Sequence, residues 1–324
     1  MALRYENIPS FGYTKRISEL IYDIDAALDS CTDDGDKTIR SVLRKNTFAA
    51  SVQSSTAIEG NTLGLQKIKE MIRGKTVDGS FDEIVEAKDA IKAYDLIDKT
   101  NITSVDCFLK IESIMMWGLV ETNGYRDGRV VITDGETIFY EPPEASEVPA
   151  MMDRLFDWCA ASRYPLYLIA AVAHYYIEAV HPFRDGNGRM GRYWHSAVLH
   201  RQDKVFRMVS IENAIYRRQQ DYYDILEECQ KAEDCTHFIE FMLELTLSSL
   251  QSLSHILEPR MSALLTAMGN KPMSSKQIMD SLGLRDRANF QTCYLRPALE
   301  YGFIAMTEPE SPHSPTQKYV RLVF

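Results

Sequence analysis

Cysteine is scarce in this chain, with six in 324 residues and no two of them in a CxxC pattern. Scattered cysteines argue against a zinc site or a disulfide framework and are typical of a reducing compartment. Glycine and proline are also sparse, at 16 and 12 residues, which excludes collagen-like and low-complexity chains. We therefore expect an ordinary globular protein whose core needs neither disulfides nor metals.

Long hydrophobic runs and an excess of positive charge are missing as well. The longest apolar stretch, 166–180, contains a histidine and a glutamate and is shorter than the roughly 20 residues that span a bilayer. The N-terminal segment has no apolar core of signal-peptide length. Acidic residues outnumber basic ones, 46 to 36, which argues against non-specific binding to DNA or anionic membranes. We expect a cytoplasmic protein with no membrane partner.

Apolar residues at helical spacing run through most of the chain. The segments that we expect to be helical are 17–29, 41–59, 65–73, 81–98, 106–117, 148–158, 165–180, 187–201, 213–230 and 235–257. Residues 129–140 break the pattern, because two short β-branched or aromatic runs flank Asp134-Gly135, which is a hairpin signal. The sequence therefore predicts a mainly α fold with one small β-hairpin.

The tail, 258–324, has a different pattern. Two helical segments joined by a glycine-containing turn precede a Pro/Ser-rich turn and a strand, which is a winged-helix outline. Residues 255–324 carry eight Lys or Arg against six Asp or Glu, which leaves −12 for the rest of the chain. This contrast permits DNA binding through the helix expected at 287–301, which contains Arg296 but is interrupted by Pro297. Protein contact or dimerisation is the alternative use of such a domain.

The most informative stretch is HPFRDGNGRMGR, residues 181–192, which joins a nearly all-apolar helix to the next helix. Gly186-Asn187-Gly188 forms a small bend at a helix N-terminus, where free backbone N–H groups and the positive end of the helix dipole bind anions. Arg189 and Arg192 are three residues apart, so both can lie on one face and grip neighbouring phosphates.

Two further side chains complete this candidate site. Asp185 is a hard oxygen ligand suited to Mg²⁺, and His181 can act as a general base. Taken alone, each is more often a turn or capping residue. The same stretch matches the dinucleotide fingerprint GxGxxG, but that motif needs a preceding strand, and a helix is expected here. Together the parts suit phosphoryl-type transfer.

The stretch resembles the signature of the Fic family, HPFx(D/E)GNGRxxR, and matches it at every specified position. The resemblance extends from about residue 51 to 245. It implies an N-terminal helical region (1–100), a Fic-type helical core (101–250) and, after it, the winged-helix domain (258–324). It also implies protein adenylylation, in which AMP passes from ATP to a Ser, Thr or Tyr hydroxyl of a target protein.

Residue roles follow from the resemblance. His181 would remove the hydroxyl proton, and Asp185 would hold Mg²⁺ on the phosphates. The residues expected to bind the nucleotide are Gly186, Asn187, Gly188, Arg189, Met190, Gly191, Arg192, Tyr222 and Gln230. Tyr222 is equally well explained as a core aromatic residue. In the related Doc proteins a lysine at the place of Gly188 reverses the nucleotide and gives phosphorylation, so Gly188 favours AMP transfer.

The hairpin resembles the family's flap, which pins the target segment by strand addition. The flap residues expected to dock the target are Val130, Val131, Ile132, Ile138, Phe139 and Tyr140. The target itself is not readable from the sequence. We expect the chain to modify itself, and we keep open a homodimer and DNA as further partners.

Residues 55–61, STAIEGN, resemble the family's inhibitory motif (S/T)xxxE(G/N). Glu59 is expected in the last turn of a helix spanning about 41–60, where its charge opposes the dipole. We expect Glu59 to pair with Arg192 and so to hold it away from the γ-phosphate, and we count Ser55 with Glu59 as an inhibitory residue. A surface carboxylate is the alternative. Three other functions stay open: a DNA-binding regulator that senses nucleotide, a Fic enzyme with another donor, and removal of AMP.

Overall fold

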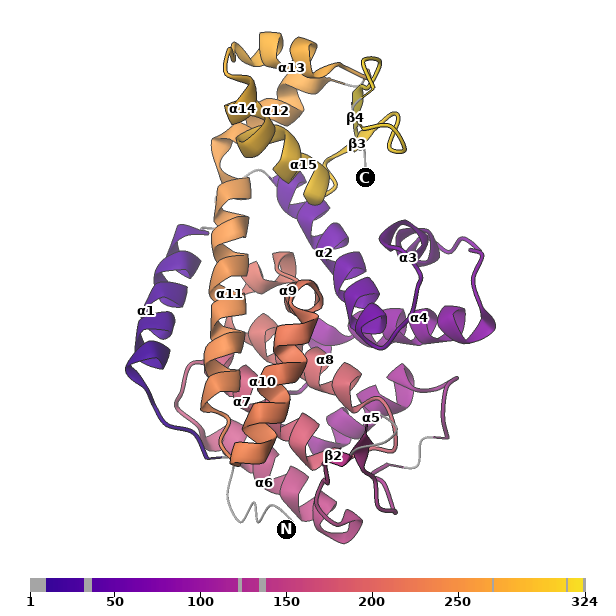
Figure 1. The fold of residues 1–324 in the computed structure, drawn as a ribbon, viewed down its shortest axis with the longest axis vertical. Helices are drawn as coiled ribbons and strands as arrows, with labels where there is room; N and C mark the ends of the chain where they lie inside the picture. Colours follow the sequence, from indigo (N-terminus) through magenta and orange to yellow (C-terminus); the bar gives the residue numbers. More distant parts are fainter. Residues whose placement is uncertain are drawn as a thin grey trace. The chain divides into compact units, whose positions relative to one another are not determined.

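The protein is described by a computed structural model that covers residues 10–31, 37–121, 124–133, 138–269, 271–312 and 314–322. Its chain divides into two units, one built from 1–26 and 48–249 and the other from 27–47 and 250–324. Helices dominate both units (Figure 1), so the predicted mainly α fold is confirmed. The expected domain boundaries stay predictions. Among the described residues, no helix combines the length and apolar character needed to cross a membrane.

The first five helices match their predicted positions closely. They are α1 (Lys15–Ser30), α2 (Lys37–Ile58), α3 (Leu65–Ile72), α4 (Phe81–Tyr94) and α5 (Val105–Met115), with a 3₁₀ turn at Ile97–Lys99. A capping box starts α4, because the Ser80 hydroxyl accepts from the Glu83 N–H while the Glu83 carboxylate accepts from the Ser80 N–H. Helix α2 ends one residue before Glu59, so this glutamate follows the last turn rather than lying in it.

The predicted hairpin is present but shorter than expected. Strands β1 (Ile132–Thr133) and β2 (Ile138–Tyr140) pair antiparallel, with an irregular register between Ile132 and Thr133. Val130 and Val131, expected in the flap, lie before the strand, and Val131 is exposed. The Asp134-Gly135 turn and the side chains of Ile138 and Phe139 lie outside what the structure describes.

The centre of the first unit is the pair α7 (Leu166–Val180) and α8 (Asn187–Gln202), which pack against each other over most of their length. Every α7 residue after Leu166 is buried, which explains its nearly all-apolar sequence. Around the pair lie α6 (Val148–Ala161), α9 (Ile211–Arg217), α10 (Gln219–Ala232) and α11 (Thr236–Leu257), with 3₁₀ turns at Ala145–Glu147 and Lys204–Met208 (Figure 1).

One helix prediction is wrong: 213–230 is two helices, α9 and α10, with a break at Arg218. The backbone of Arg218 leaves the helical region, at φ −124° and ψ 36°. Its guanidinium lies 4.7 Å from the centre of the Phe241 ring, and the next residue, Gln219, donates to the carbonyl of Ile58 at 3.1 Å. These are contacts between segments distant in sequence, so local periodicity does not reveal the break.

The second unit contains α12 (Pro259–Met268), α13 (Ser275–Leu282) and a third helical stretch before a hairpin of β3 (Ile304–Met306) and β4 (Tyr319–Arg321). The third stretch is α14 (Arg287–Phe290), a wider π-helical turn (Gln291–Leu295) and α15 (Arg296–Glu300). The irregular turn ends two residues before Pro297, which has no N–H to donate and interrupts a regular helix. The predicted order of helix, turn, helix and hairpin is therefore present, and its use stays a prediction.

Candidate active site

The loop between α7 and α8 carries the 181–192 motif and is held from within. The Asn187 side chain accepts from the Phe183 N–H at 2.8 Å and donates to the Phe183 carbonyl at 2.9 Å. The Phe183 ring is 1% exposed and lies 5.2 Å from the Phe108 ring, so it anchors the loop in the core. Burial of such a ring stabilises by about 2 kcal/mol. Asn187 therefore shapes the loop with its side chain and leaves anion contacts to its backbone.

His181 ends α7 in the left-handed region, at φ 50° and ψ 60°. Burial lowers the pKa of its imidazole, and the Glu178 carboxylate only partly offsets this effect. Within the described chain, the ring Nδ1 has no hydrogen-bond partner. A neutral imidazole with a spare nitrogen is the form that a general base requires.

The start of α8 offers an anion site next to this histidine. Its first intrahelical bond is from the Met190 N–H to the Gly186 carbonyl at 2.9 Å, so the preceding N–H groups have no acceptor within the helix. Gly186 adopts φ 83°, which glycine tolerates best, and a Cβ there would lie 2.5 Å from the Met116 sulfur. The bend therefore requires a glycine.

Arg189 connects the predicted metal ligand to a residue that sequence analysis missed. Its guanidinium donates to Glu86 on α4 at 2.7 Å and to Asp185 at 3.2 Å. Asn61, two residues after Glu59, donates to the other Glu86 oxygen at 2.8 Å. Arg189 is 5% exposed. The carboxylates of Glu86 and Asp185 thus accept the hydrogen bonds of the arginine that was expected to bind phosphates.

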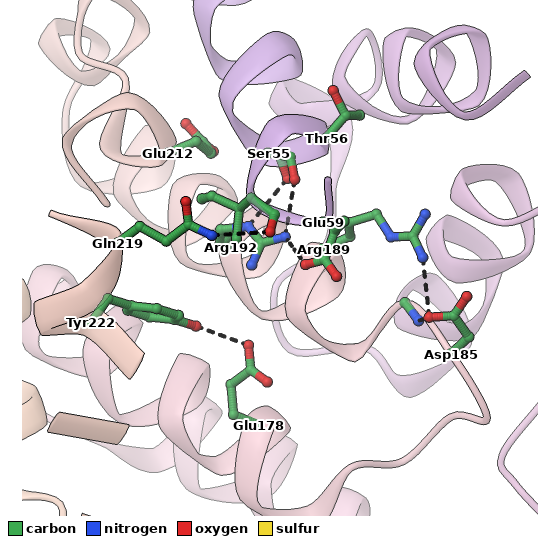
Figure 2. A network of polar contacts seen from close by, with 12 residues as sticks. Ser55, Thr56, Glu59, Glu178, Asp185, Arg189, Arg192, Glu212, Gln219 and Tyr222 are labelled. Carbon is green, nitrogen blue, oxygen red and sulfur yellow. Dashed lines mark hydrogen bonds and ion pairs between the residues drawn. The ribbon is translucent and has the colours of Figure 1, made fainter. Parts of the chain in front are cut away.

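Arg192 is held by the segment predicted to be inhibitory (Figure 2). Its Nη2 lies 2.5 Å from Glu59 Oε1 and 3.1 Å from the Ser55 carbonyl, and its Nε donates to the Ser55 hydroxyl at 3.3 Å. Arg192 is 1% exposed. Burial acts to lower the pKa of Arg192, but the Glu59 carboxylate and its other acidic neighbours raise that pKa above its ordinary value. The expected pairing of Glu59 with Arg192 is therefore present, and the structure adds two hydrogen bonds from Arg192 to Ser55.

Close packing explains the two later glycines of the motif. A Cβ on Gly188 would lie 2.8 Å from Glu59 Oε1 and 3.0 Å from Arg192 Nη1. A Cβ on Gly191 would lie 2.6 Å from the ring of His174. Gly188 thus keeps room for the ion pair, while Gly191 and the fully buried Met190 pack the helix into the core.

Tyr222 and Gln230 were assigned to the nucleotide from the resemblance. Tyr222 is completely buried, and its hydroxyl donates to Glu178 at 3.0 Å (Figure 2). The same hydroxyl lies 3.1 Å from His174 Nε2. This network favours the core-aromatic alternative for Tyr222. Gln230 is 7% exposed, and its amide nitrogen has no partner in the described part of the chain. A buried donor without an acceptor is consistent with a ligand-facing role, so Gln230 stays a candidate.

The flap is fixed to the end of α7 and to the motif loop by Tyr140, which was expected to dock the target, and by Arg126, which the sequence did not single out. The Tyr140 hydroxyl donates to the Ala179 carbonyl at 2.9 Å. Arg126, just before the hairpin, donates from Nε to the His181 carbonyl at 2.8 Å. The only feature of the sequence that could have indicated a role for Arg126 is its place next to the hairpin. Glu86 and Asn61 occupy no specified position of either family motif.

Asp185 is the residue available for a cation. Its side chain is 53% exposed and it accepts from the Gly186 N–H at 2.6 Å. Among the described residues, no group of three or more His, Cys, Asp or Glu side chains could hold a metal ion by itself. Mg²⁺ usually binds through one or two carboxylates and the phosphates of its substrate, so a single exposed aspartate beside an anion site fits that mode.

Family models match two parts of the chain. The Fic/DOC family model matches residues 102–199, and the model described as "Filamentation induced by cAMP protein Fic-like, C-terminal domain" matches residues 259–322. Proteins named protein adenylyltransferase Fic from Nematostella vectensis and Culex quinquefasciatus are 28% and 29% identical over 62% and 65% of this chain. The chain covers 48% and 44% of their lengths, so it spans about half of these relatives.

Solved structures resemble the chain over a greater length. Fic-1 from C. elegans, with 19% identity over 75% of this chain and 73% of its own, has a TM-score of 0.61 and shares the fold. A Fic family protein from Desulfovibrio desulfuricans G20 is 34% identical, with a TM-score of 0.71, and the match covers 98% of both chains. With the motif, the two family models and this nearly full-length relative in agreement, the chain belongs to the Fic family.

Proposed function

We propose that the protein is a protein adenylyltransferase that transfers AMP from ATP to a hydroxyl group of a target protein, and that Glu59 restrains it. The observation that carries the proposal is the position of His181, whose loop leads directly into the anion-binding start of α8. The names of the curated relatives support the same reaction.

His181 accepts the proton of the target hydroxyl. The hydroxyl oxygen then bonds to the α-phosphorus while the bond from that phosphorus to the β-bridging oxygen breaks, and diphosphate leaves. Such an in-line reaction depends on positioning and charge neutralisation more than on covalent help. The N–H groups at the start of α8 and the Arg189 guanidinium supply donors for the phosphate oxygens. Mg²⁺, held by Asp185 and the phosphates, would neutralise charge on the leaving diphosphate.

The restraint acts through Arg192. As long as Glu59 and Ser55 occupy this guanidinium, it is not free to bind the γ-phosphate. A triphosphate must either displace the carboxylate or bind in another pose. Because charge-assisted hydrogen bonds to a buried arginine are strong, Glu59 is an effective competitor. Binding of the triphosphate also requires Arg189 to release Glu86 and to donate to the phosphates instead.

The test uses a Glu59→Gly variant incubated with Mg²⁺ and ATP labelled either on the α- or on the γ-phosphate. We expect protein-bound label from the α-labelled ATP alone, and none when His181→Ala is added. Transfer of the γ-label would mean phosphorylation. If neither label becomes bound to protein and the protein binds DNA, the result would favour the alternative function of a DNA-binding regulator that senses nucleotide.

A further inference from the structure

Arg126 lies in the segment between α5 and β1 and is 4% exposed. In the described structure its guanidinium donates to backbone carbonyls. No ion pair of Arg126 is found among the described residues, and burial lowers its pKa. Burying a cation against neutral acceptors is costly, whereas an apolar residue of similar volume would pack there more cheaply. The acceptors of its hydrogen bonds show which segments the guanidinium connects.

Two of these bonds close the base of the flap. Nη1 donates to the carbonyl of Gly128, which precedes β1, at 2.9 Å. Nη2 donates to the carbonyl of Pro143, which follows β2. One guanidinium therefore joins the chain entering the hairpin to the chain leaving it.

The other bonds reach the catalytic loop. Nε donates to the His181 carbonyl at 2.8 Å and Nη2 lies 3.4 Å from the Val180 carbonyl. The Arg126 backbone N–H donates to the Pro182 carbonyl at 2.9 Å. Three successive carbonyls, ending with the one after the catalytic histidine, thus accept from one residue.

These hydrogen bonds lie next to a residue with an unfavourable backbone conformation. His181 has a left-handed conformation, which a non-glycine residue keeps only when its surroundings hold it. On either side of Arg126, the Tyr125 ring lies 6.0 Å from the Phe183 ring, and Asp127 pairs with Arg184 at 2.5 Å. The segment before the flap therefore braces the motif loop along its first four residues.

We propose that Arg126 is a positioning residue that fixes the flap relative to His181, and so sets the distance between a docked target hydroxyl and the imidazole. The inference rests on the proposed function, since the flap is taken to hold the target. Because the planar fork of arginine reaches several carbonyls at once, lysine is not an equivalent replacement.

The experiment compares Arg126→Lys with Arg16→Lys, both in the Glu59→Gly background. Arg16 is the matched control, since it lies in α1, outside the flap and the motif, is exposed and pairs with Glu244 at 2.7 Å. We would measure the rate of self-adenylylation, the affinity for ATP by calorimetry, and the NMR resonances of the His181 ring. Thermal unfolding would check that each variant folds. If Arg126→Lys does not fold, Tyr140→Phe removes a single flap-to-α7 bond instead.

We expect Arg126→Lys to lower the transfer rate about 100-fold, because small misplacements of reacting groups have effects of that size. ATP affinity should stay within about twofold of the parent, since the anion site is untouched, and the His181 resonances should shift. The Arg16→Lys variant should match the parent in all three. Unchanged transfer, or a parallel loss of ATP binding, would overturn the inference. If the Glu59→Gly parent transfers no AMP, the proposed function fails, and the His181 resonances alone decide about Arg126.

Discussion

Glu59 and Arg192 form an ion pair, with 2.5 Å between Oε1 and Nη2, across a sequence separation of 133 residues. Glu59 stands just past the C-terminal end of α2, where the helix dipole disfavours a negative charge. The buried guanidinium compensates for that unfavourable position. The pair therefore ties the end of α2 to the residue that closes the motif.

Glu59→Gln keeps the shape of the side chain but removes its charge, so the competition for Arg192 weakens. A hydrogen bond to a charged group contributes roughly 1.5–3 kcal/mol, which corresponds to at least about a tenfold increase in self-adenylylation. The rate is measured with α-labelled ATP. Glu19→Gln is the control, because Glu19 forms an exposed pair with Lys15 and its replacement should leave the rate unchanged. Equal rates for both variants and wild type would contradict the inhibitory role.

Glu86→Gln should lower the free energy of unfolding by roughly 1.5–3 kcal/mol, because the buried Arg189 loses its shorter charged contact and keeps only the longer one with Asp185. Urea denaturation measures the loss. Glu141→Gln, which breaks the exposed pair with Arg129, should leave the free energy of unfolding nearly unchanged. Equal losses of unfolding free energy in the two variants would contradict the claim that the Glu86–Arg189 contact stabilises the fold.

The transfer rate of the activated protein should resist acid. Burial lowers the pKa of His181, so its imidazole stays neutral as the pH falls through the ordinary histidine value of about 6.5. The base is lost only when the pH falls through the lowered pKa. A pH–rate profile of Glu59→Gln with α-labelled ATP checks this, at saturating Mg²⁺. A midpoint at or above the ordinary value would contradict the buried setting of the ring.

Glu112 on α5 gives a pH-dependent stability. It is 3% exposed, and burial raises its pKa from 4.5 to about 7. The folded protein therefore holds this proton more tightly than the unfolded chain, so the contribution is greatest below the unfolded pKa and is lost as the pH rises through 7. Relative to wild type, Glu112→Gln should gain about 3 kcal/mol between pH 4.5 and 8. Urea denaturation at both values measures the gain, and a difference that does not change with pH would contradict it.

Much of the helical core could be predicted because its signals are local. The apolar run expected at 165–180 became α7 (Leu166–Val180), and a contiguous motif placed His181, Asp185 and both arginines together. The break between α9 and α10 could not be predicted, since the interactions of Arg218 and Gln219 lie far away in sequence.

The partners of the site residues were harder to predict than the residues themselves. Glu86 lies 103 residues before Arg189 and Arg126 lies 55 residues before His181, and neither belongs to a pattern that records such a pairing. Tyr222 shows the opposite problem: an aromatic residue on a helix has the same local pattern whether it faces a ligand or the core, and only its burial in the structure favours the core.

Intact-protein mass spectrometry of Glu59→Gly, after incubation with ATP and Mg²⁺, tests the central claim most directly. The account predicts an increase by one or more adenylyl groups, which His181→Ala in the same background abolishes. An unchanged mass, or an increase by phosphoryl groups, would contradict the account.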